Sequence, residues 1–307
     1  MKKLIGNKKV AVLISTYNGE KYIQEQIDSV LNQTYKNIKI YVRDDESKDN
    51  TSKILEEYQK NNKITFIQGK NVGFVKSFMN LLSVCEDADY YAFCDQDDVW
   101  NEDKIERAVK MLEKENNNLP LLYASNYDFY NSNMEFISHS PFKIKKPSFQ
   151  KSVIECISPG MTMVMNKALK SVIQKNIPEE CAFHDWWTYE VCSAFGKVIY
   201  DSKATVKYRR HEKNVSDEEA GIIKNLVKTI KRGSFSDIWG KLKKQLIEFD
   251  KIYAKELKEE DKKLLELFTN EKFNFSNYIK KVFYSGRFKD NLKDEIMIRI
   301  MFIINKI

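Results

Sequence analysis

The sequence predicts an α/β protein, with a three-layer, mostly parallel sheet followed by a helical C-terminal extension. Three observations support this class. Short apolar runs alternate four times with amphipathic helical patterns before Asn101, which is typical of consecutive βαβ units. Each run ends in a cluster of polar residues, as strands do at the ligand-binding edge of a parallel sheet. After Ser216 the alternation stops and helical spacing replaces it.

Six runs rich in β-branched and aromatic residues are the expected strands. They are residues 10–14, 38–42, 64–67, 90–94, 121–129 and 198–200. Amphipathic helices are expected after the first four runs, at residues 20–33, 51–60, 75–84 and 101–115. The loop after the first run contains neither G-x-G-x-x-G nor a P-loop lysine, so the sequence supports neither a dinucleotide-binding fold nor a Walker ATPase.

The composition indicates a reduced, cytoplasmic protein with a substantial core. Apolar residues make up 42% of the 307 residues, which is enough to form such a core. The five cysteines include no C-x-x-C pair, so free thiols are expected rather than disulfides or a zinc site. The N-terminal segment lacks a signal-peptide cleavage site, and no stretch is long enough to span a bilayer.

The net charge of +7 is unevenly distributed along the chain. Residues 222–307 contain 20 Lys and Arg against 12 Asp and Glu, whereas residues 1–221 contain 31 against 32. The neutral larger part argues against nucleic-acid binding, and the basic tail favours an anionic surface as its partner. We therefore predict one domain at residues 1–215 and a basic helical extension at residues 216–307 that docks on a membrane or a partner.

An acidic cluster, Asp95-Gln96-Asp97-Asp98, follows the apolar run at residues 90–94. Three carboxylates in four residues repel one another, and a hard cation among them would relieve that repulsion. Mg²⁺ takes one or two protein carboxylates and completes its shell with water and substrate phosphate. The cluster therefore predicts a divalent cation that holds a diphosphate. The alternative is a solvated acidic turn before a helix.

Two later motifs supply further candidate site residues. In HDWW, at residues 184–187, apolar walls would raise the pKa of Asp185 and prepare it to act as a base. The alternative is a helix N-terminus with an aspartate cap and core indoles. Further along, Arg209 and Arg210 could hold a phosphate, and His211 could ligate a metal. The alternative there is a solvated basic loop.

The C-terminal extension has two apolar patterns. A capping-box-like start at residues 234–237 precedes apolar residues at three-, four- and seven-residue spacing, which predicts an amphipathic helix with a lysine-rich face. These residues are Leu242, Leu246, Phe249, Tyr253, Leu257, Leu264 and Phe268. The second pattern, at residues 296–304, is apolar but too short to span a bilayer. It could lie on a membrane, or pack on the main domain or a second subunit.

Six motifs, taken in order, resemble those of the family-two glycosyltransferases of the GT-A fold. They are STYNGEKYI at 15–23, RDDESKDNT at 43–51, NVGF at 71–74, DQDDVW at 95–100, HDWW at 184–187 and YRRHEKNV at 208–215. The resemblance covers about the first 215 residues. The last three motifs together are similar to the bacterial rhamnosyltransferase-like branch, which builds cell-wall and capsular polysaccharides.

The resemblance implies a role for each matching position. Asp185 would be the general base, and Asp97 and His211 would ligate Mg²⁺ or Mn²⁺. The implied nucleotide-binding residues are Thr16 and Tyr17 near the base, Asp44 on the base imide N–H, Asp45 near the ribose, Asp95 on the ribose or the metal's water shell, and Arg209 or Arg210 on the diphosphate, together with Asn18 and Asn71. The chain departs from the family at Glu46, where Gly is usual, and at residues 210–212, where Gln-His-Gly is commoner.

The implied activity is an inverting, metal-dependent sugar transfer, because one base without an enzyme nucleophile gives a single displacement. The donor would be a dTDP- or UDP-sugar, with rhamnose from dTDP-rhamnose as the narrower expectation. The acceptor would be a glycan or a polyprenyl-linked lipid at the inner face of the plasma membrane, in cell-wall or capsule synthesis. The alternatives are a UDP-hexose donor, a nucleotidyltransferase and a non-catalytic membrane scaffold. The C-terminal helices could also form a homodimer.

Overall fold

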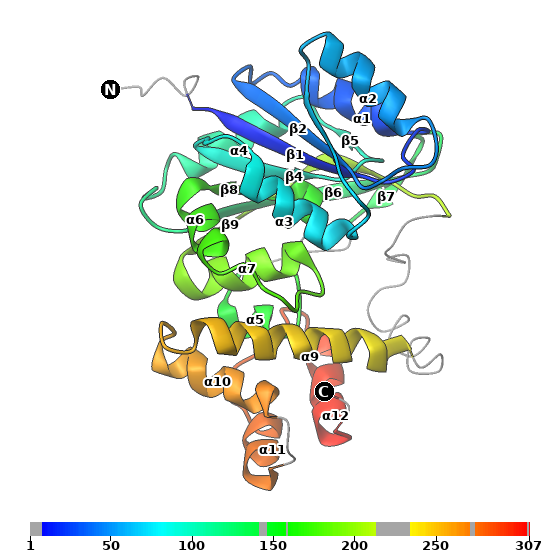
Figure 1. The fold of residues 1–307 in the computed structure, drawn as a ribbon. Helices are drawn as coiled ribbons and strands as arrows, with labels where there is room; N and C mark the ends of the chain where they lie inside the picture. The colour runs from blue at the N-terminus through cyan, green and yellow to red at the C-terminus, as the bar shows by residue number, and fades with distance from the viewer. Residues whose placement is uncertain (1–7, 141–145, 158, 213–233, 271–273, 306) are drawn as a thin grey trace. The chain divides into compact units, whose positions relative to one another are not determined.

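The computed structural model describes residues 8–140, 146–157, 159–212, 234–270, 274–305 and 307. These residues form two compact units (Figure 1). Within the described ranges, the first unit contains residues 8–140, 159–177 and 196–212, and the second contains the remainder. The units are interleaved in sequence because residues 146–157 and 178–195 pack with the C-terminal helices. The division predicted at residues 215 and 216 stays a prediction.

The first unit is organised around one nine-stranded sheet in the order β3-β2-β1-β4-β8-β6-β9-β5, with β7 paired to β6. The strands β1 to β4 are parallel to one another, and so are β6 and β9; β5, β7 and β8 are antiparallel to their neighbours. The bounds are β1 Val10–Thr16, β2 Ile38–Asp44, β3 Thr65–Gln68, β4 Tyr90–Cys94, β5 Val99–Trp100, β6 Leu121–Tyr130, β7 Phe136–His139, β8 Val164–Asn166 and β9 Lys197–Arg209. The predicted mostly parallel α/β sheet followed by helices is confirmed.

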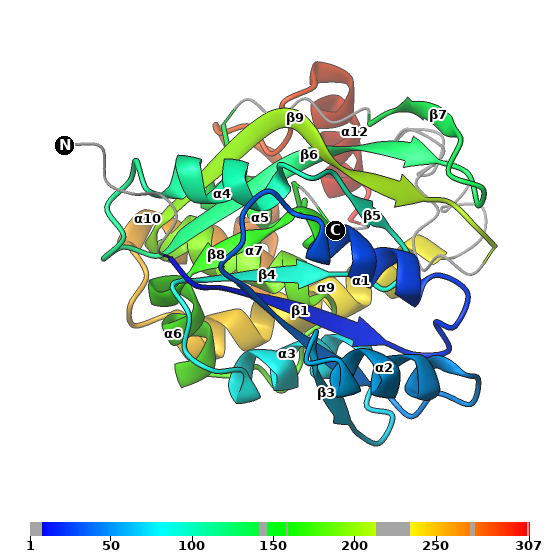
Figure 2. The same cartoon turned by 90° about the horizontal axis from the view of Figure 1, so that it is seen from above.

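Helices cover both faces of this sheet, which makes three layers (Figure 2). Their bounds are α1 Ile23–Leu31, α2 Thr51–Lys60, α3 Phe74–Val84, α4 Lys104–Leu112 and α6 Lys167–Lys175. Successive side chains of a strand point to opposite faces, and the apolar residues of β1 are buried on both sides. Val12 belongs to the core that contains Ile27 of α1 and Ile105 of α4, whereas α3 contacts the sheet from the other face.

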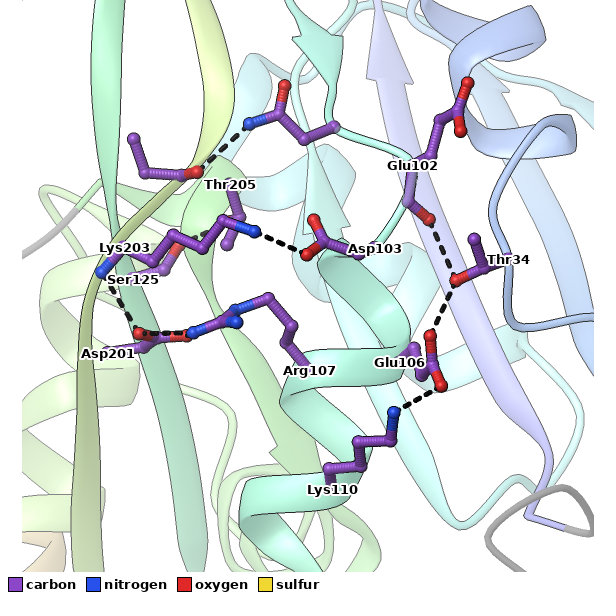
Figure 3. Close-up of polar contacts among 12 residues, drawn as sticks. Thr34, Glu102, Asp103, Glu106, Arg107, Lys110, Ser125, Asp201, Lys203 and Thr205 are labelled. Carbon is purple, nitrogen blue, oxygen red and sulfur yellow. Dashed lines mark hydrogen bonds and ion pairs between the residues drawn. The ribbon is translucent and has the colours of Figure 1, made fainter.

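The strand β9 extends well beyond the predicted residues 198–200, since it pairs in parallel with β6 along its length. Charged side chains at the start of α4 and before it contact polar side chains of β9 (Figure 3). Arg107 donates to both carboxylate oxygens of Asp201, each at 2.9 Å. Lys203 Nζ donates to Asp103 at 2.6 Å. Apolar periodicity alone could not predict this extension, since the partners lie about a hundred residues away in the chain. β9 thereby carries the chain to Arg209, next to the predicted metal ligand His211.

The second unit is helical in its described part. Its helices are α5 Phe149–Ser152, α7 His184–Phe195, α9 Ser234–Tyr253, α10 Glu259–Thr269, α11 Phe275–Val282 and α12 Leu292–Ile303. The expectation of one amphipathic helix through Phe268 is wrong, because the chain turns after Tyr253 and α10 packs on α9. Phe249 and Leu265 are fully buried. The turn allows both halves of the apolar pattern to be buried, whereas one straight helix would leave much of it exposed.

The described helices are too short or too polar to span a bilayer. A membrane-spanning helix needs about 20 predominantly apolar residues. None of the described helices is long and apolar enough to meet that requirement.

Candidate active site

Most of the predicted site residues lie at the C-terminal ends of β1, β2 and β4 in the first unit. Thr16, the last residue of β1, is in register with Asp44, the last residue of β2. Ile14 of β1 is in register with Cys94, the last residue of β4, directly before Asp95. Because these three strands are parallel, the loops that follow them start from one edge of the sheet.

The glutamine of the acidic cluster joins two of these loops. Gln96 Oε1 accepts from Thr16 Oγ1 at 2.6 Å and from the backbone N–H of Tyr17 at 2.9 Å. Its Nε2 donates to the carbonyl oxygen of Tyr17 at 3.2 Å. The ring of Tyr17 remains 44% exposed, so an aromatic face is available beside this junction. The sequence interpretation missed Gln96, although its position between two aspartates was a signal.

The loops after β1 and β2 are joined in the same way. The Asn18 N–H donates to Ser47 Oγ at 2.8 Å, and Asn18 Oδ1 accepts from the N–H of Lys48 at 2.8 Å. Asp44 is buried, and its oxygens accept from the Ser47 N–H at 3.0 Å and from Ser52 Oγ at 3.1 Å. Its carboxylate is therefore held in one orientation, with its position fixed by the start of α2.

Glu46, where the family usually has glycine, has φ +69° in this turn. That value lies in the left-handed region, which glycine adopts without strain and other residues adopt at a cost. The side chain is exposed, and its carboxylate accepts from the N–H of Asn71 at 3.4 Å. The turn thus has the conformation that a glycine would favour, with glutamate in it.

Asp45 is buried and serves the NVGF turn. Its carboxylate accepts from the N–H groups of Val72 at 3.0 Å and Gly73 at 2.8 Å, and it forms an ion pair with Arg43. Asn71 is exposed at the start of that turn. Asn71 Oδ1 accepts from the N–H of Gly73 at 3.2 Å. Asp45, the residue predicted near the ribose, therefore fixes the backbone of this turn, and Asn71 lies exposed beside it.

The structure brings the two predicted metal ligands together. Nε2 of His211 lies 2.9 Å from Oδ2 of Asp97. The ring of Tyr22 stacks on the imidazole, with the ring centroids 4.9 Å apart. One carboxylate and one imidazole fit a divalent cation that takes its other ligands from water and phosphate. Among the described residues, no group of three or more His, Cys, Asp or Glu side chains has the geometry of a complete metal cage.

Asp98, the last acid of the cluster, has a different role from Asp97. It is fully buried, and its Oδ1 accepts from the N–H of Arg209 at 3.0 Å, which anchors the end of β9. Burial, together with the neighbouring Asp97 and Asp95 carboxylates, raises the pKa of Asp98 well above its usual value. Asp95 and Asp97 are only partly buried. The acidic cluster therefore divides into outward-facing carboxylates and one internal anchor.

The two arginines at the end of β9, Arg209 and Arg210, have different surroundings. Arg209 is buried; its Nε donates to the carbonyl oxygen of Asp97 at 2.8 Å, and its guanidinium forms an ion pair with Glu25. The guanidinium also lies 4.6 Å from the centroid of the Tyr22 ring. Arg210 is half-buried. The guanidinium donors of Arg209 are thus engaged by contacts within the protein, which leaves Arg210 as the better placed of the two to bind a phosphate.

Asp185, the predicted base, lies in the first turn of α7 in the second unit. It is half-buried, and its Oδ1 accepts from the N–H of Trp186 at 2.8 Å. The Trp186 indole N–H donates to the carbonyl oxygen of Ser152 at 2.5 Å, whereas Trp187 is fully buried in the core. His184 is also buried, and burial lowers the pKa of its imidazole.

α9 holds the segment that leads into α7. The buried Gln245 accepts through Oε1 from the N–H groups of Ala182 at 3.0 Å and Phe183 at 3.2 Å. Its Nε2 donates to Glu190 of α7 at 2.9 Å. Glu248, one turn along α9, accepts from the N–H of Glu179 at 3.2 Å. The orientation of the turn that carries Asp185 therefore depends on a helix of the C-terminal extension.

Comparison with known proteins adds independent findings. Residues 11–173 match the model of glycosyl transferase family 2. The dTDP-rhamnosyl transferase RfbG of Shigella flexneri is 34% identical over 217 residues, which are 66% of this chain and 72% of that protein. The UDP-Glc:alpha-D-GlcNAc-diphosphoundecaprenol beta-1,3-glucosyltransferase WfgD of Escherichia coli is 31% identical over 164 residues, 52% of this chain and 61% of that protein.

Two solved structures share the fold at low sequence identity. S. aureus TarS 1–349 in complex with UDP-GlcNAc superposes with a TM-score of 0.63 at 19% identity, covering 97% of this chain and 81% of that one. The mannosyltransferase PcManGT from Pyrobaculum calidifontis, in complex with GDP-Man and Mn²⁺, has a TM-score of 0.52 at 14% identity, covering 84% and 68%.

Proposed function

The chain belongs to glycosyl transferase family 2, and from that premise we propose that it is an inverting, metal-dependent transferase that moves a sugar from a nucleotide diphosphate to a glycan or lipid-linked acceptor. The observation that carries the proposal is the 2.9 Å contact between Asp97 and His211, beside the loops that carry Thr16 and Asp44. A carboxylate and an imidazole at the nucleotide-binding edge of the sheet suit a cation that holds a diphosphate.

The nucleotide base lies against Tyr17 in this proposal, since the Tyr17 ring is exposed where the loops after β1 and β4 meet. Asp44 accepts the imide N–H of the base with the lone pairs that Ser47 and Ser52 leave available. Thymine and uracil carry the same imide N–H group, so this hydrogen bond to Asp44 suits both dTDP-sugars and UDP-sugars. Asn18 and Asn71 are exposed in the loops beside Asp44 and complete the nucleotide-binding set in this proposal.

The diphosphate is held by the groups around Asp97. When bound, Mg²⁺ or Mn²⁺ would neutralise the charge that develops on the departing diphosphate. Asp97 and His211 would hold the cation, and Asp95 would contact its water shell or the ribose. We assign the phosphate contact to Arg210, because Arg209 is buried and engaged by Asp97 and Glu25. Arg209 instead keeps Asp97 and the end of β9 in place.

Asp185 takes the proton of the acceptor hydroxyl as that oxygen attacks the anomeric carbon. A half-buried carboxylate in the first turn of α7 suits this role, since it keeps access to the acceptor while α9 fixes its helix. No enzyme nucleophile is involved, so a single displacement inverts the anomeric centre. His184 remains neutral because burial lowers its pKa, and it orients its neighbours.

Rhamnose from dTDP-rhamnose is the donor that we favour, on the strength of the similarity to a dTDP-rhamnosyl transferase. A UDP-hexose is the second candidate, supported by the similarity to a UDP-Glc-dependent glucosyltransferase. The name of that relative includes a diphosphoundecaprenol acceptor, and we propose a polyprenyl-linked acceptor here too. Such a reaction would serve cell-wall or capsular polysaccharide synthesis at the inner face of the plasma membrane.

The test is a donor panel with the full chain. dTDP-rhamnose, UDP-glucose and UDP-GlcNAc are each incubated with Mn²⁺, and released nucleoside diphosphate and pyrophosphate are measured separately. We expect dTDP release from dTDP-rhamnose to exceed release from the other donors by at least roughly tenfold. Faster UDP release would favour the UDP-hexose reaction. Pyrophosphate release would indicate a nucleotidyltransferase, and no turnover or binding of any donor would contradict the proposal.

A further inference from the structure

α12 is apolar on two opposite sides. Ile298 and Phe302 are buried in the second unit. On the opposite side of the helix, five large aliphatic side chains are exposed, and Leu292 is 63% exposed. They are Leu292, Ile296, Ile300, Ile303 and Ile304. A helix that buries one apolar side and exposes a second carries more apolar surface than its own unit covers, and exposed apolar patches of this kind mark contact surfaces.

α11 has a second exposed apolar stripe. Phe275, Ile279 and Phe283 recur every four residues, and Phe283 is 76% exposed. The two helices pack on each other: the Tyr278 hydroxyl donates to the carbonyl oxygen of Ile303 at 2.7 Å. We call these eight side chains of α11, α12 and their C-cap residues Phe283 and Ile304 the apolar face. Neither of these helices is long and apolar enough to cross a bilayer, so the apolar face would contact a bilayer only in the plane of its interface.

The charges around the apolar face are cationic. Lys280 lies three residues before Phe283 on α11, and Lys293 lies three residues before Ile296 on α12, so each lysine is on the side of its stripe. Both lysines are exposed. Two of the nearby acids are engaged: Asp290 pairs with Lys151 at 2.5 Å, and the buried Glu295 pairs with Arg299 at 2.8 Å. Asp294, in the first turn of α12, is half-buried, so the exposed charges beside the stripes remain mainly cationic.

We propose that the apolar face lies in the interface of an anionic lipid bilayer, with Lys280, Lys293 and the exposed Arg287 against the lipid headgroups. Large apolar side chains beside lysines are the pattern of helices that lie in the membrane plane. A second copy of the chain fits less well. A two-fold interface places the same patch of each copy together, so it would bring these cations against one another, whereas anionic lipid attracts them.

The experiment is sedimentation of the full chain with vesicles of phosphatidylcholine alone or with roughly 30% phosphatidylglycerol. The wild-type protein should bind the anionic vesicles more tightly. Phe283→Ser with Ile300→Ser should weaken binding to those vesicles by at least roughly tenfold. Lys280→Gln with Lys293→Gln should weaken it by roughly ten- to thirtyfold, at about 1 kcal/mol per lysine, with little effect on binding to neutral vesicles.

The matched control is Val84→Ser with Ile137→Ser, which removes exposed apolar side chains of the first unit and should leave vesicle binding unchanged. The proposal fails if the wild-type protein does not bind anionic vesicles, or if the Phe283 and Ile300 variant binds them as well as the control does. It also fails if sedimentation velocity without lipid shows a dimer that this variant dissociates. Nucleoside diphosphate release from a soluble donor is measured in parallel and tests the transferase proposal separately.

Discussion

Gln245 is predicted to keep the turn that carries Asp185 in its folded position. Its side-chain oxygen accepts from two backbone N–H groups before α7 and, at 4.0 Å, weakly from the Cys181 thiol. Its side-chain nitrogen donates to Glu190 within α7. Gln245→Ala removes all of these contacts. We expect α7 to open locally far more often, while the sheet of the first unit stays folded.

The magnitude follows from the burial of the groups left behind. Ala182 and Phe183 are only half-buried, so water can reach their N–H groups and each lost bond costs about 1 kcal/mol. Glu190 is fully buried, and its other oxygen has no hydrogen-bond partner among the described residues, so losing the Gln245 donor costs about 1–3 kcal/mol more. The sum is about 3–5 kcal/mol, or a factor of roughly 10² to 4 × 10³ in the opening equilibrium.

Native-state hydrogen exchange measures this equilibrium residue by residue. The amide protection of α7 should fall by that factor in Gln245→Ala, while the protection of β1 should not change. Lys244→Ala, at an exposed position beside Gln245 on the same helix, is the control and should alter neither. Unchanged protection of α7, or an equal loss in α7 and β1, would refute the reasoning.

Three further predictions concern the first unit. Asp97→Ala should abolish metal-dependent binding of a nucleoside diphosphate in calorimetry, whereas Asp98→Asn should retain it because the acceptor for the Arg209 N–H remains; equal losses would show that the cluster does not divide as described. Glu46→Gly should raise the free energy of unfolding by about 0.5–1 kcal/mol, since φ +69° costs glycine little, and a loss of stability would contradict this. Burial lowers the pKa of Lys104 from 10.5 in the unfolded chain to about 7, so the unfolded state binds more protons between these values and stability rises with pH across that window. Lys104→Met should remove this rise in urea denaturation, and a rise of the same size in the variant would exclude Lys104 as its source.

The strand–loop–helix order of the first unit could be predicted because each strand carries its own local signal. The run at residues 90–94 is apolar throughout and contains three aromatic residues, and it forms β4 at the predicted residues. Parallel pairing then places the polar residues after β1, β2 and β4 at one edge, which is why Thr16 and Asp44 are in register. Asp97 and His211 also lie in loops that follow strands, β4 and β9, which is consistent with their contact.

Long-range partners explain what the sequence could not give. Nothing in the letters of the acidic cluster distinguishes Asp98 from Asp97; the difference arises because β9 places the N–H of Arg209 against Asp98. The adjacent arginines Arg209 and Arg210 also differ through long-range contacts. Arg209 pairs with Glu25 of α1 and lies against the ring of Tyr22, the residue before α1. Tyr22 belongs to the motif STYNGEKYI, but the sequence does not predict that its ring stacks on His211.

The C-terminal extension shows the same limit. The pattern from Leu242 to Phe268 predicted an amphipathic helix with a lysine-rich face for an anionic surface, but all of its apolar side chains except the half-buried Leu257 are buried in the second unit. The exposed apolar face is on α11 and α12 instead. A helical period predicts an apolar stripe but does not predict which element packs on it. Here α7, whose first residues are the motif HDWW, packs on α9, with the ring centroids of the buried Trp187 and Phe249 5.5 Å apart.

The central claim, that Asp185 is the general base, is tested most directly by single-turnover sugar transfer in two neighbouring variants. Asp185→Asn keeps the shape of the side chain and an acceptor for the Trp186 N–H, but it cannot take a proton at neutral pH. We predict that its transfer rate falls by roughly 10²–10⁴-fold while its affinities for donor and metal stay close to wild type. His184→Gln should reduce transfer much less. Normal turnover by Asp185→Asn together with an inactive His184→Gln would contradict the assignment.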